Sequence, residues 1–276
     1  MSTYTLNIGS ITCTVIAEGT SEVQASSLPQ RYPNATQEEI NTAIEAMGGG
    51  EAFPNYFNVL LIDTGKTKIL VDAGMGENED RPQIGQTVPV LRAEGIAPED
   101  IDMVFITHFH GDHYMGLLTD GTPTFPNASY ITRDEELAFW TSEETKAKLG
   151  DRVQGIMTYL DALDFETVSA GEELASGVKV MAIPGHTMGQ SALLIQDGDE
   201  ALLHLVDTLH STAQFANPQW HFVWDTDAEL GVQTRRAQLG NAVNRQMMTM
   251  FYHLPFPGIG YVKRDGDAFA WKPIND

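Results

Sequence analysis

Three histidines and one aspartate lie within the segment 107–113, whose sequence is THFHGDH. His108 and His110 are two residues apart, so on an extended backbone both imidazoles point the same way and can meet at one metal ion. The glycine that follows lets the chain turn, so that Asp112 and His113 can face a second ion nearby. Imidazole and carboxylate ligands without thiolate favour zinc, manganese, iron or cobalt. The segment therefore predicts a metal site with ligands for two ions.

Three further polar residues follow apolar segments and can complete this site. They are His186 after the strand expected over 178–183, Asp207 after the strand expected over 201–206, and His253. We assign one ion to His108, His110 and His186, and the other to Asp112, His113 and His253, with Asp207 bridging the two. Such a site leaves positions for a bridging water, and Asp112 and Asp207 are the candidates for proton transfer. Asp72 ends an apolar strand and is expected to orient a ligand histidine by a hydrogen bond.

The other histidines and several aromatic residues have less specific surroundings. We expect structural roles for His204, His210 and His221, or hydrogen bonds to a metal-ligating residue without direct contact to the metal. Six aromatic residues are candidates for the wall of a substrate pocket, with core packing as the alternative for each. They are Phe139, Trp140, Phe215, Trp220, Phe222 and Trp224.

The strands and helices that must position these residues form a similar series in each half of the chain. Strands are expected over 6–8, 11–17, 56–62, 67–71, 102–107, 128–132, 178–183, 190–196 and 201–206, and helices over 88–94, 134–149 and 228–244. This pattern predicts one α/β domain over 1–276, with two stacked sheets flanked by helices and the site at one edge. Residues 20–55 are rich in Ser, Pro, Asn and Gly. They predict a long excursion, with a helix over 37–47, that serves as a dimer arm or a pocket lid.

The charge and composition of the chain argue against some classes of binding partner and cellular location. The 276 residues carry 16 basic and 38 acidic side chains, a formal charge of −22 that repels nucleic acid and anionic membranes. The single cysteine, Cys13, lies in an alternating strand-like segment and is expected to be a small buried side chain. The N-terminus lacks the pattern of a signal peptide and no apolar run is long enough to span a bilayer, so a cytoplasmic location is expected.

Three segments resemble motifs of the metallo-β-lactamase superfamily. THFHGDH resembles its HxHxDH motif, IDTGKTKILVDAGMG at 62–76 resembles its early hairpin, and IPGHTMGQSALLI at 183–195 resembles its PGHTxG segment. The C-terminal stretch 253–274 and the block 214–239 are similar to methyl parathion hydrolase and to lactonases that degrade acyl-homoserine lactones. The chain departs from the family at Met115, Val206 and Tyr261, where glycine, glycine and histidine are frequent. These departures leave the ligands intact and affect the shape of the pocket.

The resemblance implies an αββα sandwich and a dinuclear hydrolase that uses a metal-bridging hydroxide. The expected cofactors are two divalent ions per chain, with zinc first and manganese, cobalt or iron as alternatives. The expected substrates are lactones of the acyl-homoserine lactone type or esters, with phosphotriester cleavage as a side activity. A phosphotriesterase acting mainly on organophosphates, a β-lactamase and a non-catalytic metal-binding protein are the alternatives. A homodimer acting on a small molecule, without nucleic-acid or membrane partners, is expected.

Overall fold

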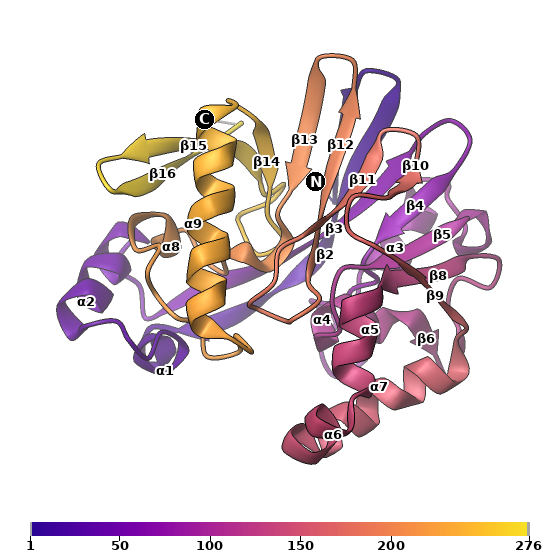
Figure 1. Cartoon of the computed structure of the whole chain (residues 1–276), viewed down its shortest axis with the longest axis horizontal. Helices are drawn as coiled ribbons and strands as arrows, with labels where there is room; N and C mark the ends of the chain where they lie inside the picture. The colour runs from indigo at the N-terminus through magenta and orange to yellow at the C-terminus, as the bar shows by residue number, and fades with distance from the viewer. Residues whose placement is uncertain (1, 275–276) are drawn as a thin grey trace.

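Two seven-stranded sheets form the centre of the computed structural model, which describes residues 2–274 (Figure 1). The first sheet contains, in spatial order, β1 (Thr3–Ile8), β2 (Ile11–Gln24), β3 (Ala52–Asp63), β4 (Lys68–Val71), β5 (Met103–Ile106), β8 (Ser129–Arg133) and β9 (Phe165–Val168). The second contains β10 (Glu173–Ala175), β11 (Val178–Ala182), β12 (Ser191–Asp197), β13 (Glu200–His204), β14 (Met248–Met250), β15 (Ile259–Asp265) and β16 (Ala268–Pro273). A small hairpin of β6 (Leu118–Thr119) and β7 (Thr122–Pro123) lies apart from both sheets.

Helices cover the outer faces of both sheets. Those on the first sheet are α3 (Thr87–Ala93), α5 (Asp134–Thr141), α6 (Glu143–Leu149) and α7 (Asp151–Ala162), and those on the second are α8 (Ala213–Ala216) and α9 (Ala228–Asn244). Figure 1 shows α9 and the α5–α7 group on opposite sides of the molecule. The remaining helices are α1 (Leu28–Arg31), α2 (Gln37–Ala46) and α4 (Gly111–Tyr114). This arrangement is the αββα sandwich that the sequence predicts.

The core between the sheets is built from the apolar sides of their strands. Cys13, Leu60 and Phe105 of the first sheet pack with Leu193 and Met250 of the second, and all five are buried. Burying a side chain of this size stabilises the fold by ~1.5–3 kcal/mol relative to leaving it in water. The expectation that Cys13 is a small buried side chain is therefore confirmed.

Strand β5 explains why the site lies at one edge of the sandwich. It pairs in parallel with β4 on one side and β8 on the other. A parallel strand covered on both faces is a short apolar run, which is what MVFI at 103–106 is. The carboxyl ends of β4 and β5 therefore meet at the same edge, and the segment 107–113 begins there.

Two expected elements differ in the structure. The excursion expected over 20–55 is shorter, because β2 and β3 continue to pair as far as Gln24 and Ala52. Between them lie α1 and α2, the latter over 37–46 with a capping box formed by Thr36 and Glu39. The single helix expected over 134–149 is two helices, because Ser142 has extended backbone angles and caps α6 through the N–H of Thr145.

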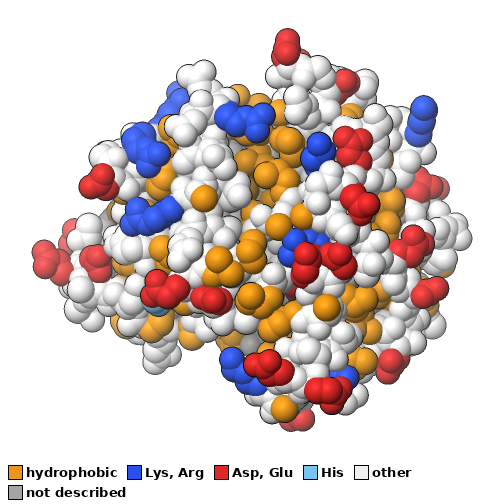
Figure 2. Space-filling model, viewed as in Figure 1, with side chains coloured by type: hydrophobic (Ala, Val, Ile, Leu, Met, Phe, Trp, Pro, Cys, Tyr) orange, Lys and Arg blue, Asp and Glu red, His pale blue; other side chains and the backbone are white. Residues whose placement is uncertain are grey.

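The surface is acidic, as the composition requires. Figure 2 shows Asp and Glu side chains spread over the face seen in Figure 1, with apolar side chains between them. Among residues 2–274, no helix combines the length and the apolar character that a bilayer span needs.

Candidate metal centre

The segment after β5 carries four of the candidate ligands into the edge of the sandwich. His108 follows β5 and is buried, while His110 has extended backbone angles and precedes α4. The first turn of α4 then brings Asp112 and His113 around to a different side, since the N–H of His113 donates to the carbonyl of His110 at 2.9 Å. One segment thus presents two pairs of side chains in two directions.

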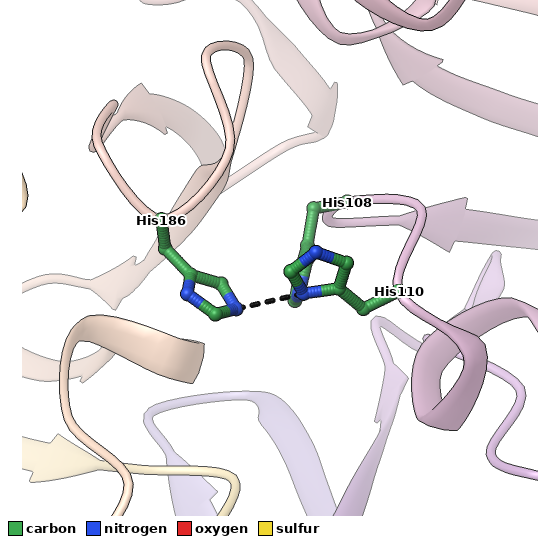
Figure 3. Close-up of side chains that lie close together, drawn as sticks. All are labelled: His108, His110 and His186. Carbon is green, nitrogen blue, oxygen red and sulfur yellow. Dashed lines mark hydrogen bonds between the residues drawn. The ribbon is translucent and has the colours of Figure 1, made fainter. Parts of the chain in front are cut away.

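The first ligand group joins the two halves of the chain. His108, His110 and His186 offer ring nitrogens that lie within 4.8 Å of one another. Nδ1 of His110 is 2.8 Å from Nε2 of His186, the contact drawn in Figure 3. His186 comes from the loop after β11, on the other sheet, so the fold brings together residues that are 76 positions apart.

The second ligand group contains Asp112, His113, Asp207 and His253, again with ligand atoms within 4.8 Å of one another. Nε2 of His253 lies 3.1 Å from Oδ2 of Asp207 and 3.4 Å from Oδ2 of Asp112. Nε2 of His113 lies 3.3 Å from Oδ2 of Asp207. The structure therefore brings together the residues that we assigned to the second ion.

Asp207 lies between the two groups. Its Oδ2 is 3.7 Å from Nε2 of His108 and 3.5 Å from Nε2 of His186, in addition to its contacts with the second group. The preceding residue, Val206, has φ 45°, a left-handed conformation that is strained for a β-branched side chain. The strained turn aims the carboxylate of Asp207 at both groups.

The side chains at this edge fit divalent metal ions. Nε2 of His108, Nε2 of His113 and Oδ1 of Asp207 are buried and make no hydrogen bond within the described part of the chain. A buried polar atom without a partner costs ~1–3 kcal/mol, so three such atoms at one site would destabilise the fold. Coordination of cations satisfies these atoms, and imidazole with carboxylate suits zinc and its first-row neighbours.

Asp72 is placed to orient one ligand. It follows β4 with φ 65°, and its carboxylate accepts hydrogen bonds from the N–H of Thr107 at 2.8 Å and from the hydroxyl of Thr107 at 2.9 Å. Its Oδ2 also lies 2.8 Å from Nδ1 of His113. A ring that donates from Nδ1 to a carboxylate presents Nε2, with its lone pair, to a metal.

Asp225 is placed to orient His186 in the same way, and the sequence analysis did not identify it. Its Oδ1 lies 2.8 Å from Nδ1 of His186. Burial acts to lower the pKa of His186, but Asp207 and Asp225 outweigh burial and raise that pKa to about 9. Asp225 lies in the acidic stretch before α9, and no local pattern distinguishes it from its neighbour Asp227, which caps the helix.

Glu136 on α5 joins the loops that carry the first ligand group, and it was also missed. Its Oε1 accepts hydrogen bonds from the N–H of Phe109 at 2.8 Å and from Nε1 of Trp140 at 2.7 Å. Its Oε2 accepts from the hydroxyl of Thr187 at 2.6 Å and from the N–H of Gly189 at 3.0 Å. Phe109 lies between two of the histidines and Thr187 directly follows the third. Burial raises the pKa of Glu136, and these hydrogen bonds oppose that rise.

Electrostatics keeps the charge on Asp207. Burial acts to raise the pKa of Asp207, but the neighbouring His253 and His113 outweigh it and hold that pKa well below its usual value. Burial likewise acts to lower the pKa of His113, but Asp207 and Asp72 hold it well above its usual value. Asp207 is thus an anion at neutral pH, the charge state in which a carboxylate binds a cation.

His210 lies in the site, unlike the other two histidines set aside in the sequence analysis. Its Nε2 is 3.3 Å from Oδ2 of Asp207, and with His186 and Asp207 it forms a third group of possible ligands. By contrast, His204 is buried on β13, and burial lowers its pKa to about 4. His221 pairs at the surface with Glu229, 3.2 Å away. No pattern in the local sequence marks His210.

Two adjoining cavities open onto these residues. The site cavity, of about 510 Å³, has Ser21, Arg31, Asn55, Phe57, Met75, Arg81, Ile84, His110, Gly111, Asp112, His186, Asp207, His210, Phe222, Trp224 and His253 in its wall. The apolar cavity, of about 220 Å³, has Val23, Leu28, Arg31, Tyr32, Met47, Phe53, Pro54, Asn55, Tyr56, His210, Ser211, Thr212, His253 and Pro255. The segment between β2 and β3 thus supplies part of the wall of the apolar cavity.

The six aromatic candidates occupy three kinds of place. Phe222 and Trp224 line the site cavity. Phe139, Trp140 and Trp224 line another pocket, which also has His110 in its wall. Trp220 packs against Tyr32, with ring centroids 4.8 Å apart, and Phe215 stacks on Trp271 in the core of the second sheet.

Comparison with known proteins agrees with this geometry. The family model described as "Metallo-beta-lactamase superfamily" matches residues 54–245. An N-acyl homoserine lactonase of Bacillus sp is 25% identical over 176 residues, which are 57% of this chain and 65% of that protein. The lactamase-like protein adaB of Aspergillus niger is 29% identical over 189 residues, which are 66% of this chain and 50% of that protein. The chain therefore spans less than two thirds of the length of these relatives.

Two solved structures are similar over nearly the whole chain. AidC, a dizinc quorum-quenching lactonase in complex with the product N-hexanoyl-L-homoserine, has a TM-score of 0.90 and 25% identity, covering 99% of this chain and 97% of its own. The hydrolase AbOPH, described as a member of the β-lactamase superfamily, has a TM-score of 0.87 and 26% identity, with the same coverage. The fold and the family therefore rest on independent comparisons.

Proposed function

This chain belongs to the metallo-β-lactamase superfamily, and from that premise we propose that it is a dinuclear hydrolase of lactones of the acyl-homoserine lactone type. The observation that carries the proposal is the position of Asp207, whose Oδ2 lies within 3.7 Å of histidines from both ligand groups. A carboxylate in that position would be shared by two bound ions. We propose zinc for both, because the ligand set suits it and a similar structure is a dizinc lactonase.

The chemistry divides between the cofactor and the chain. When bound, the two ions supply a hydroxide at neutral pH and polarise the carbonyl of the substrate. Asp207 holds its negative charge between the ligand groups, and Asp72 and Asp225 fix the rings of His113 and His186. The side chain of Asp112 is 22% exposed, against 2% for Asp207. Asp112 is therefore the carboxylate that can carry a proton to the alkoxide of the opened ring.

The apolar cavity supports a substrate with an acyl chain. It adjoins the site cavity through shared wall residues, and its wall is mainly aliphatic and aromatic. An acyl chain placed there leaves water while the lactone lies beside the ligand groups. Esters are a related substrate class, and phosphotriester cleavage is a side activity in this proposal, because the same pair of ions can activate water against phosphorus.

We further propose a single domain over 1–276 that acts as a homodimer in the cytoplasm. The half-exposed Val223 and Trp224 lie beside Arg31 of α1, where they offer apolar surface to a second copy. The single buried cysteine suits a reducing compartment. Size-exclusion chromatography with light scattering tests the dimer, and a mass of about one chain at micromolar concentration would contradict it.

The function is tested by kcat/KM for N-hexanoyl-homoserine lactone and for methyl parathion, measured on one metal-loaded preparation with a chelated control. We expect the lactone to be preferred by at least about 100-fold, a difference of ~2.7 kcal/mol in transition-state stabilisation. A higher kcat/KM for methyl parathion would favour the alternative function, a phosphotriesterase that acts mainly on organophosphates. Activity that survives chelation would contradict a metal-dependent mechanism.

A further inference from the structure

His210 is held in a fixed orientation by rings on both of its faces. Phe222 stacks on one face, with centroids 3.6 Å apart and planes inclined by 18°. His253 lies on the other face at 5.2 Å with planes inclined by 26°. The guanidinium of Arg31 lies over the ring of Phe222, 5.2 Å from its centroid. The column therefore leaves only the edge of the His210 ring, with its nitrogens, to meet other groups.

One ring nitrogen of His210, Nδ1, has no partner in the described part of the chain. Nδ1 is buried without a hydrogen bond, whereas Nε2 faces Oδ2 of Asp207 at 3.3 Å and the backbone N–H donates to Oε1 of Gln214. The residue as a whole is 6% exposed. A ring that is buried and packed between other rings, with one nitrogen lacking a partner, has the properties of a group that hydrogen bonds to a ligand.

The position of His210 indicates which part of a ligand it meets. The site cavity and the apolar cavity share four wall residues, which are Arg31, Asn55, His210 and His253. His253 is already engaged, because its Nδ1 lies 2.9 Å from the carbonyl of Tyr56 and its Nε2 lies 3.1 Å from Asp207. His210 is thus the buried side chain at this junction that keeps one ring nitrogen, Nδ1, without a partner in the described part of the chain.

We propose that His210 determines specificity by hydrogen bonding to the amide group that joins an acyl chain to the lactone ring. This inference rests on the proposed function, which places the lactone in the site cavity and the acyl chain in the apolar cavity. The amide then lies at the junction, where it needs polar partners because it has left water. A neutral imidazole that carries its proton on Nε2, toward the carboxylate of Asp207, leaves Nδ1 as an acceptor for the amide N–H.

A metal-ligand role for His210 is the competing explanation. His210, His186 and Asp207 are close enough to hold an ion. However, His186 and Asp207 already belong to the two groups that hold the proposed pair of ions. Metal content therefore separates the two roles. Substituting a metal ligand lowers the metal content, whereas substituting a residue that contacts only the substrate leaves it unchanged.

The test compares two lactones in three forms of the metal-loaded protein. The substrates are N-hexanoyl-homoserine lactone and α-heptyl-γ-butyrolactone, in which methylene groups replace the amide at the same ring position. The variant His210→Phe keeps the stacked ring without nitrogens, and His210→Gln keeps a donor and an acceptor without the ring. For His210→Phe we expect kcat/KM to fall by about 10- to 100-fold on the amide lactone and by less than about threefold on the alkyl lactone.

Three further readouts complete the design. We expect His210→Gln to recover part of the preference for the amide lactone, and metal content by mass spectrometry to equal that of the wild type in both variants. Calorimetry should show that His210→Phe binds the ring-opened product N-hexanoyl-homoserine more weakly by a similar factor. Thermal melting checks that each variant is folded.

The outcomes that overturn the inference are distinct from those that overturn the proposed function. An equal loss on both lactones would place His210 at the reacting carbonyl, and loss of metal in both variants would make it a ligand. Unchanged kinetics in His210→Phe would remove it from substrate recognition. A wild type that cleaves neither lactone would refute the proposed function itself, and the inference with it.

Discussion

Asp207 is the side chain on which both ligand groups depend. Replacing it by alanine removes the shared carboxylate and leaves several imidazoles facing one another without an anion between them. We expect Asp207→Ala to lose at least one ion per chain and to lower kcat/KM by more than about 100-fold. Metal analysis and lactone kinetics check both numbers. Asp199→Ala, in an exposed turn, is the matched control, and a variant that keeps both ions with full turnover would refute the bridging assignment.

Glu136 contributes to stability through hydrogen bonds that only a carboxylate can accept. Its partners are two backbone N–H groups, the indole N–H of Trp140 and the hydroxyl of Thr187, so the NH2 group of Glu136→Gln must face at least one N–H donor. We expect a loss of about 2–4 kcal/mol in the free energy of unfolding, measured by denaturant titration.

Its neighbour provides the control for that experiment. Glu135 has a side chain that is 57% exposed and contacts Arg133 at 3.3 Å. Glu135→Gln should change stability by less than about 0.5 kcal/mol. If both substitutions changed the free energy of unfolding equally, the hydrogen bonds of Glu136 would not stabilise the fold as its contacts indicate.

Glu18 links two elements, the bulge of β2 and the loop between β4 and α3. The register of β2 against β3 shifts between Ala17 and Gly19. Oε1 of Glu18 accepts from the N–H groups of Met75 and Gly85, both at 2.8 Å, while Oε2 is buried without a partner. Burial, opposed by these hydrogen bonds, raises the pKa of Glu18 from 4.5 to about 7.

This raised pKa predicts a pH dependence of stability. Between about pH 4.5 and 7 the folded protein holds a proton on Glu18 that the unfolded chain releases, so the contribution of this group falls as pH rises. Gln at this position cannot ionise and still turns a carbonyl oxygen to both amides. In metal-depleted protein, we expect the melting temperature of Glu18→Gln to rise relative to wild type from about pH 5 to about pH 8. The control is Glu22→Gln, at an exposed position of the same strand, whose melting temperature should change with pH as that of the wild type does. If the melting temperature of Glu18→Gln also followed the wild type at every pH, the raised pKa of Glu18 would be contradicted.

Elements with a strong local pattern were predictable, and those that depend on distant partners were not. The apolar run of β5 has the composition of a buried parallel strand wherever it occurs. The extensions of β2 and β3 contain Ser, Glu, Pro and Asn, and they form strands because each pairs with the other. The break at Ser142 depends on one capping hydrogen bond, which helical propensity does not reveal.

The same distinction explains what could be predicted of the site. The ligands in THFHGDH are contiguous, and the remaining ones follow strands whose ends meet at one edge. Glu136 and Asp225 have no such pattern, because each acts through a contact with a residue far along the chain. His210 lies only three residues after Asp207, but no motif in the local sequence marks it. Their roles became visible only when burial and hydrogen-bond partners were known.

The whole molecule shows why metal should stabilise the fold as well as act in catalysis. His108, His110 and His113 follow the first sheet, whereas His186 and Asp207 come from the second. Ions held by both sets of ligands join the two sheets at the edge of the sandwich. A ligand that binds only the folded state at about 1,000 times its Kd adds ~4 kcal/mol to the free energy of unfolding.

Chelation should therefore destabilise the protein as a unit. For a chain of this size, such a loss lowers the melting temperature by about 10 °C, and added zinc should restore it. Asp207→Ala should respond much less to the chelator, because it lacks the shared ligand that holds the sites of both sheets together. Calorimetry with and without chelator measures both effects. A wild-type melting temperature unmoved by complete metal removal would mean that the ligand edge is held by the chain alone, through Glu136, Asp72 and Asp225, and that the ions serve only the reaction.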